Sequence, residues 1–203
     1  MSEAPRLAVF ASGGGRSLEN LAHSIADGSL ACRLALVVCD RSDALVLERA
    51  ERLGIESVLI DPGRELGAAA FSRAAFESVQ AHDCQLVVLA GFLRLLSLPA
   101  NWNGRVLNIH PSLLPAFGGK GYYGDRVHLA VLESGAQFTG CTVHYVNDEY
   151  DAGRILLQRC IPVLPDDTPE SLAARVFAEE RLALPAAITL HLKRERERSG
   201  ARA

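Results

Sequence analysis

The chain has 203 residues, of which 49% are hydrophobic and 22% charged, and its formal net charge is -3. This composition supports one sizeable core, so we expect a single domain over residues 1–203. The slight negative charge argues against a nucleic-acid partner, and the lack of any run near the roughly 20 apolar residues of a membrane span argues for a cytoplasmic protein.

Short apolar runs alternate with helical patterns through the first half of the chain. The runs indicate strands buried on both faces, and the segments between them have the spacing of amphipathic helices. The predicted strands are 7–11, 34–39, 57–60 and 86–90, and the predicted helices are 18–26, 44–53 and 68–81. This βαβαβαβ order predicts an α/β fold with a mostly parallel sheet, and Asp43 is placed to cap the second helix.

A glycine-rich turn, Ser12-Gly13-Gly14-Gly15-Arg16-Ser17, joins the first predicted strand to the first predicted helix. Backbone amides and the helix dipole converge on an anion at such a position, which predicts a phosphate site, and Arg16 adds a guanidinium. The dinucleotide pattern G-x-G-x-x-G fails at its third glycine, where Leu18 stands, although Asp40 ends the second strand as a ribose-binding acid would. A tight structural turn is the alternative.

The second half has a different rhythm, with a long loop and fewer helices. The predicted elements are a strand at 106–109, a glycine- and proline-rich loop at 111–124, a helix at 126–133 and strands at 139–146 and 155–163. Loops of this length in compact domains are usually functional, so this one is a candidate ligand wall. A long last helix begins with Thr168 as its cap, and Pro185 is expected to kink or interrupt it.

Asn108 and His110 are two residues apart at the end of a predicted strand, so both side chains project from one face. An amide and an imidazole converging at the carboxyl edge of a sheet are suited to hold an oxyanion and to move a proton. Asp148, Glu149 and Asp151 lie in the turn between two later strands. One of these acids is expected to partner His110, and a solvated hairpin turn is the alternative.

Other chemistries find less support in the sequence. His128 and His144 have no metal-ligand spacing with His110, and the acidic turn lacks the spacing of a calcium loop, so we expect no metal. The five cysteines are scattered and form no C-x-x-C pair, which predicts reduced, mostly buried thiols. No G-x-S-x-G nucleophile motif is present.

Four segments together resemble the glycinamide ribonucleotide formyltransferases, the folate-dependent transformylases of purine synthesis. The segments are SGGGRSL at 12–18, VVLAGFLRLLS at 87–97, LNIHPSLLP at 107–115 and DEYDAG at 148–153. The third is highly specific to folate-dependent formyl transfer. The resemblance implies a Rossmann-like α/β fold, 10-formyltetrahydrofolate as co-substrate, small-molecule substrates without nucleic acid, membrane or metal, and it leaves a homodimer open. Residues 1–100 would form the phosphate-binding half, 101–192 the catalytic and folate-binding half, and 193–203 a charged tail.

The resemblance also implies roles for individual residues. Asn108, His110 and Asp151 would be catalytic, with Asp151 holding His110 in its protonated form. The implied substrate-binding residues are Gly13, Gly14, Gly15, Arg16, Ser17 and Glu180, and the implied folate-binding residues are Arg73, Leu93, Arg94, Leu95, Leu96, Asn147, Asp148, Glu149 and Tyr150.

Departures from the family pattern concern substrate contacts. Ser17 replaces the usual Asn, and the loop at 117–124, which brings Lys120 toward a ligand, differs from the commoner form. Two related activities stay open as alternatives: methionyl-tRNA formyltransferases usually add a basic C-terminal domain, and formyltetrahydrofolate deformylases usually add an N-terminal regulatory domain. A silent nucleotide-binding module that uses the glycine turn and Asp40 is the alternative from another class.

Overall fold

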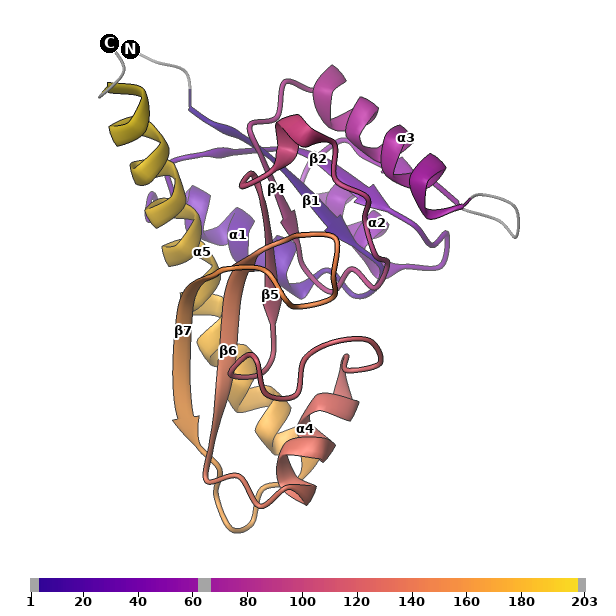
Figure 1. The fold of residues 1–203 in the computed structure, drawn as a ribbon. Coiled ribbons are helices and arrows are strands. Elements are labelled where there is room, and N and C mark those ends of the chain that lie inside the picture. The colour runs from indigo at the N-terminus through magenta and orange to yellow at the C-terminus, as the bar shows by residue number, and fades with distance from the viewer. Residues whose placement is uncertain (1–3, 62–66, 201–203) are drawn as a thin grey trace.

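The computed structural model describes residues 4–61 and 67–200, in which a single seven-stranded sheet carries helices on both faces (Figure 1). Its strands are β1 (Arg6–Ala11), β2 (Arg33–Cys39), β3 (Ser57–Leu59), β4 (Leu86–Leu89), β5 (Val106–His110), β6 (Phe138–Tyr145) and β7 (Ile155–Pro162). Its α-helices are α1 (Arg16–Ala26), α2 (Leu45–Arg52), α3 (Ala68–Ala81), α4 (Asp125–Glu133) and α5 (Pro169–Gly200), with a 3₁₀ turn at Ala100–Trp102.

The strand order is β3-β2-β1-β4-β5-β6-β7. The first five strands in this order pair in parallel, and β6 and β7 add an antiparallel edge. The chain leaves β1 toward one edge of the sheet and returns at β4 to build the other. Ligands of open α/β sheets bind at such a switch point, outside the carboxyl ends of the strands.

Alternate residues of the central strands face two separate hydrophobic clusters. Val9 and Leu107 pack with residues of α1, α2, α4 and α5 on one face, whereas Phe10 and Val106 pack with α3 and Trp102 on the other. The aromatic rings of this second cluster touch one another, as in the pair of Phe10 and Phe92 with ring centroids 5.5 Å apart. Burial on both faces explains why the strands are continuous apolar runs in the sequence.

The mostly parallel α/β sheet is confirmed, and the predicted elements lie within two residues of the observed ones. Four cysteines are buried and Cys160 is exposed, all five as free thiols, in agreement with the prediction. The predicted cap of α5 is also confirmed, because Thr168 Oγ1 accepts the Ser171 backbone N–H at 3.2 Å. The cap of α2 was predicted wrongly. Asp43 pairs with Arg41 instead, and Ala44 at the N-cap provides no side-chain hydrogen bond.

A kink or an interruption of α5 was expected at Pro185, and the interruption is wrong, because the helix continues through this residue to Gly200. A proline lacks the N–H that would bond the carbonyl four residues earlier, here that of Arg181. Asn20 on α1 fills this role, since its Nδ2 donates to the Arg181 carbonyl oxygen at 2.9 Å. The charged run at 193–198 belongs to the same helix.

Candidate functional site

A cavity of about 580 Å³ opens beside the carboxyl ends of β1, β4 and β5. Its walls come from segments far apart in the sequence: the glycine turn, the loop after β4, the end of β5, the long loop before α4, the β6–β7 loop and one side of α5. The lining residues are 13–17, 90–93, 108–111, 119–126, His128, Tyr150, Asp151, Ala173, Phe177 and Glu180. The loop predicted as a ligand wall therefore does line the cavity.

The glycine turn is locked to the loop after β4. The Ser12 N–H donates to the Gly91 carbonyl oxygen at 3.1 Å, and Ser12 Oγ accepts the Leu93 N–H at 3.2 Å. Gly15 has a φ of 74°, and a Cβ there would lie 2.6 Å from Val46 Cγ2, so this position requires glycine. Gly13 and Gly14 have no atom within 4 Å of an added Cβ, so they leave the N-terminus of α1 open.

The Arg16 side chain contacts an aromatic ring of α5 on the other side of the cavity. Its guanidinium carbon lies 4.1 Å from the centroid of the Phe177 ring. Glu180, three residues further along the same helix, is partly buried, and burial raises the pKa of its carboxyl to about 7 while the charge of Arg16 lowers it. The turn thus presents a fixed cation beside backbone amides, which suits a phosphate.

Asn108 connects His144 to Asp151. Asn108 Nδ2 donates to Asp151 Oδ1 at 3.2 Å and lies 3.0 Å from His144 Nε2. His144 Nδ1 lies 2.9 Å from the carbonyl oxygen of Tyr145, which can only accept, so Nδ1 carries a proton. His144 Nε2 also lies 3.6 Å from Asp151 Oδ1, so the three side chains form one cluster.

Asp151 lies between His110 and the long loop. Its Oδ2 is 3.5 Å from His110 Nδ1 and accepts the Gly119 N–H at 2.9 Å. Burial raises the pKa of Asp151, but contact with His144, the charge of His110 and the Gly119 N–H outweigh it and lower the pKa below 3.8. The acid is consequently a carboxylate at neutral pH.

His110 is buried, and its Nε2 lies 2.8 Å from the Phe117 carbonyl oxygen. Burial lowers its pKa below 6.5, although Asp151 and the Phe117 carbonyl act in the opposite direction. This direction differs from the expected protonated His110 and favours a neutral imidazole at pH 7. Its Nε2–H then donates to Phe117, and Nδ1 faces the carboxylate.

The other predicted site residues fall into two groups. The five residues of the glycine turn, Glu180, Leu93 and Tyr150 line the cavity with the three catalytic candidates. Arg94 turns away to pair with Asp40 at 3.1 Å, so Asp40 is not a free ribose-binding acid. Leu96 is buried in the core beside α3, and Arg73 is exposed on α3. Leu95, Asn147, Asp148 and Glu149 lie outside the lining.

Some residues of the site were not predicted. His144 does not line the cavity, but it contacts Asn108 because β5 and β6 pair antiparallel with Asn108 opposite His144, and no local pattern reveals that register. Phe177 is spaced three residues before Glu180, so a helical wheel would have placed the two on one face. Arg126, His128 and Ala173 are further lining residues that were not predicted, whereas Tyr122 and Tyr123 belong to the loop predicted as a ligand wall.

Within residues 4–61 and 67–200, none of the helices is long and apolar enough to cross a membrane. No group of three or more His, Cys, Asp or Glu side chains in these ranges is arranged to hold a metal ion.

Comparison with known proteins gives consistent matches. The family described as formyl transferase matches residues 5–188. A phosphoribosylglycinamide formyltransferase of Bacillus subtilis is 36% identical over 185 residues, covering 90% of this chain and 92% of the relative. The chloroplastic phosphoribosylglycinamide formyltransferase of Arabidopsis thaliana is 43% identical over 178 residues, covering 86% of this chain. The crystal structure of glycinamide ribonucleotide transformylase 1 from Symbiobacterium toebii superposes with a TM-score of 0.86 at 40% identity, covering 93% of this chain and 87% of that one.

Several relatives are longer than the matched region. The match spans 61% of the Arabidopsis protein, 57% of a Vigna unguiculata protein with the same name and 18% of a trifunctional purine biosynthetic protein of Bos taurus. The activity of each of these longer proteins belongs to that protein as a whole and is not thereby an activity of this chain.

Proposed function

The chain belongs to the formyl transferase family, and on that premise we propose that it transfers the formyl group of 10-formyltetrahydrofolate to the amine of 5-phosphoribosylglycinamide, a step of de novo purine biosynthesis. The relatives from Bacillus subtilis and Arabidopsis thaliana are both named phosphoribosylglycinamide formyltransferases, which supports this choice of substrate. The match to the Bacillus protein weighs most, because it covers 92% of that relative.

One observation carries the proposal. Asn108, His110 and Asp151, from two distant parts of the chain, converge on one cavity that also contains the glycine turn. The cavity of about 580 Å³ is within the usual range of small-molecule sites. Its lining includes both the glycine turn, which suits a phosphate, and the three candidates for acyl chemistry.

We assign the glycine turn to the phosphate of the ribonucleotide. Gly13, Gly14 and Gly15 directly precede α1, with Gly15 at its N-cap, and the guanidinium of Arg16 is fixed on Phe177 beside them. Glu180 lies on the α5 side of the same cavity, and a pKa near 7 lets its carboxyl accept a hydrogen bond from the glycinamide end or donate one to it.

The folate would occupy the other side of the cavity. Leu93 from the loop after β4 and Tyr150 from the β6–β7 loop line that wall. Arg94, Leu95 and Leu96 act in this proposal through their backbone, since the Arg94 side chain pairs with Asp40. The remaining folate assignments, Arg73 and 147–149, require contact with parts of the co-substrate that extend beyond the cavity.

In the proposed chemistry the amine nitrogen bonds to the formyl carbon, the bond from that carbon to the folate nitrogen breaks, and one proton moves from the amine to the departing nitrogen. Negative charge grows on the formyl oxygen in between. Asn108 stabilises that charge by releasing its longer hydrogen bond, the one to Asp151. The lowered pKa of His110 favours its imidazole as the carrier of the proton, with Asp151 balancing the positive charge.

The test is a two-substrate assay that measures release of tetrahydrofolate. We expect release only when formyl-folate and glycinamide ribonucleotide are both present. Release with formyl-folate alone would indicate a deformylase, and no release would indicate a binding module.

Asn108→Ala examines the assigned chemistry in the same assay. Because losing one oxyanion donor costs about 2.7–4 kcal/mol of barrier, we expect kcat to fall roughly a hundredfold or more with little change in KM. His110→Ala should also lose most activity. An Asn108→Ala enzyme within threefold of wild type would contradict the role of Asn108.

A further inference from the structure

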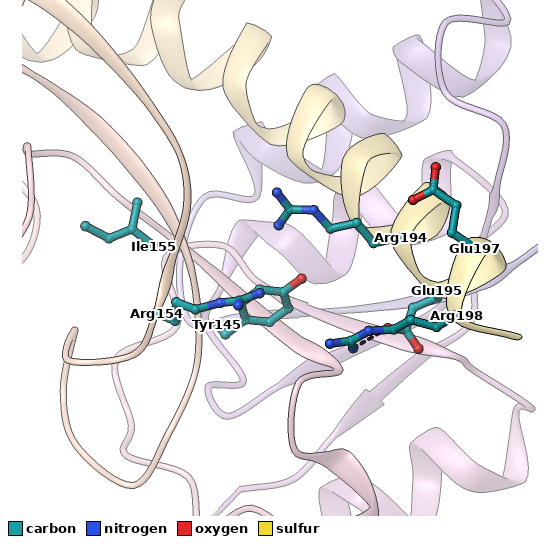
Figure 2. A pocket seen from close by; sticks show the side chains of 7 residues that line it. All are labelled: Tyr145, Arg154, Ile155, Arg194, Glu195, Glu197 and Arg198. Atoms are coloured by element: carbon teal, nitrogen blue, oxygen red, sulfur yellow. Dashed lines mark hydrogen bonds and ion pairs between the residues drawn. The ribbon is translucent and has the colours of Figure 1, made fainter. Parts of the chain in front are cut away.

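A second cavity has a volume of about 620 Å³, and Figure 2 shows the side chains that line it. We call it the arginine groove; it is lined by Tyr145, Arg154, Ile155, Arg194, Glu195, Glu197 and Arg198. It lies between the start of β7 and the last turns of α5, and it shares no lining residue with the catalytic cavity. The Tyr145 N–H donates to the Arg154 carbonyl oxygen at 2.9 Å, which closes the base of the loop that carries Asp151.

Three guanidinium groups approach the same space in the arginine groove. Arg154 lies over the Tyr145 ring, with its guanidinium carbon 5.3 Å from the ring centroid. Arg194 and Arg198 extend from α5 toward Tyr145 on the opposite wall (Figure 2). Side chains of like charge repel one another, so such an arrangement is stabilised when an anion lies between them.

The acidic residues nearby only partly balance this charge. Arg198 pairs with Glu195 at 3.1 Å, and Glu197 pairs with Lys193 at 3.9 Å and points away from Tyr145 (Figure 2). Among the residues that the structure describes, neither Arg154 nor Arg194 forms an ion pair with a carboxylate. Two guanidinium groups thus remain for a ligand.

His191 lies next to the groove, where it contacts Tyr145. It is buried, and its Nδ1 lies 3.2 Å from Tyr145 Oη. Burial is the main cause of its lowered pKa, Glu195 raises the pKa, and the smaller effects of Arg105, Arg198 and Arg194 lower it. Two of the groove arginines, Arg194 and Arg198, therefore lie close enough to act on this imidazole.

From this excess of guanidinium groups we infer that the arginine groove binds a polyphosphate anion, as the phosphate chain of a nucleoside triphosphate or as inorganic tripolyphosphate. Each guanidinium can bind a phosphate through two parallel hydrogen bonds, so a chain of phosphates can engage Arg154 and Arg194 at once. A volume of about 620 Å³ exceeds the needs of a single small ion. Because Arg154 and His191 already contact the Tyr145 ring, the groove recognises the phosphates rather than a base.

Calorimetric titration of the full chain with tripolyphosphate, and separately with ATP, tests this inference. The double variant Arg154→Gln/Arg194→Gln should bind tripolyphosphate at least roughly tenfold more weakly than wild type, since each lost guanidinium removes charge-assisted hydrogen bonds. The matched control is Arg33→Gln/Arg196→Gln, which removes the same charge from exposed positions outside the groove and should bind like wild type. Equal melting temperatures of the two variants show that both are folded.

A third variant separates the groove from the catalytic cavity. Arg16→Gln removes a cation from the catalytic cavity only, so it should leave the affinity of the groove unchanged. The inference is overturned if wild type binds neither compound, if the groove variant binds as tightly as its control, or if only Arg16→Gln weakens binding. Tighter binding of ATP than of tripolyphosphate at the groove would overturn recognition through phosphates alone.

Discussion

Arg16 shows how a single side chain links two parts of the proposed phosphate site. It begins α1 directly after the glycine turn, and a free arginine there would sample many rotamers. The Phe177 ring, 4.1 Å from the guanidinium carbon, holds it in one place. Phe177 therefore acts as a positioning residue, because it touches Arg16 rather than the reacting atoms.

Phe177→Leu tests this arrangement by removing the ring while keeping apolar volume. A cation–π contact contributes about 0.5–2 kcal/mol depending on its exposure, so we expect the KM for the phosphorylated amine to rise roughly threefold to tenfold with kcat nearly unchanged. Phe177→Tyr keeps the ring face and should restore the KM. Equal KM values for the leucine and tyrosine variants would show that the ring does not hold Arg16.

At the scale of residues, the sequence predicts chemistry well where it is local. Asn108 and His110 alternate with buried Leu107 and Ile109, and the two-residue period of a strand is sufficient to place both on one face. His144 reaches the site through the antiparallel pairing of β5 and β6, which no local pattern reveals, whereas the spacing of Phe177 from Glu180 is a local signal that was missed. The protonation of His110 depends on its burial, which is also a tertiary property.

At the scale of elements, a side chain of α1 provides a hydrogen-bond donor that the backbone of α5 lacks. Pro185 leaves the Arg181 carbonyl without its helical N–H, and Asn20 of α1 donates to that carbonyl instead. Asn20 Oδ1 also accepts a hydrogen bond from Arg181 Nε at 3.2 Å. The two helices that frame the phosphate side of the cavity are thereby tied together beside the position of Arg16.

A double-mutant cycle tests this substitution of donors. We expect Asn20→Ala to lower the free energy of unfolding by about 0.5–1.5 kcal/mol, the usual net contribution of a hydrogen bond. In a Pro185→Ala background the helix regains its own N–H, so the same change should have a smaller effect. Urea unfolding of the four proteins gives the coupling. Equal effects in both backgrounds would mean that Asn20 does not substitute for the missing donor.

The same element explains which boundaries the sequence can predict. The helix predicted over 68–81 coincides with α3, because an alanine-rich amphipathic segment begins after Gly67 and no proline interrupts it. The interruption at Pro185 was predicted from the proline alone, whereas Asn20, 165 positions away in the chain, decides the outcome. Asp43 does not cap α2 for a similar reason, because its carboxylate accepts a hydrogen bond from the Arg41 side chain instead.

At the scale of the whole molecule, buried titratable groups lie on several elements. The pKa values of His110, His128 and His191 are all lowered, chiefly by burial. Among the described histidines and carboxyl groups, two shift upward: the pKa of His82 is raised by its hydrogen bonds with the Ser78 carbonyl and Glu56, and that of Glu180 rises to about 7 through burial. The order of strands that brings these groups together could not be predicted beyond the parallel half, because the antiparallel pairings are long-range.

These shifts predict how stability depends on pH. A histidine whose pKa is lowered in the folded protein binds fewer protons than it does in the unfolded chain, so the free energy of unfolding decreases as pH falls through the ordinary value of 6.5. His82 and Glu180 act in the opposite direction, since each holds its proton more firmly in the folded protein. With three groups against two, we expect the melting temperature to fall by a few degrees between pH 7.5 and pH 5.5.

His128→Asn tests which groups cause this loss. His128 is buried in α4, and its Nδ1 has no hydrogen-bond partner among the residues that the structure describes, so acidification must bring an uncompensated charge into the fold or unfold it. Without this histidine, the melting temperature should depend less steeply on acidification, and the variant should gain relative to wild type as pH falls. Glu180→Gln should make the loss steeper, because it removes a group that opposes it. Parallel melting curves for wild type and His128→Asn across this range would refute the assignment of the pH dependence to buried imidazoles.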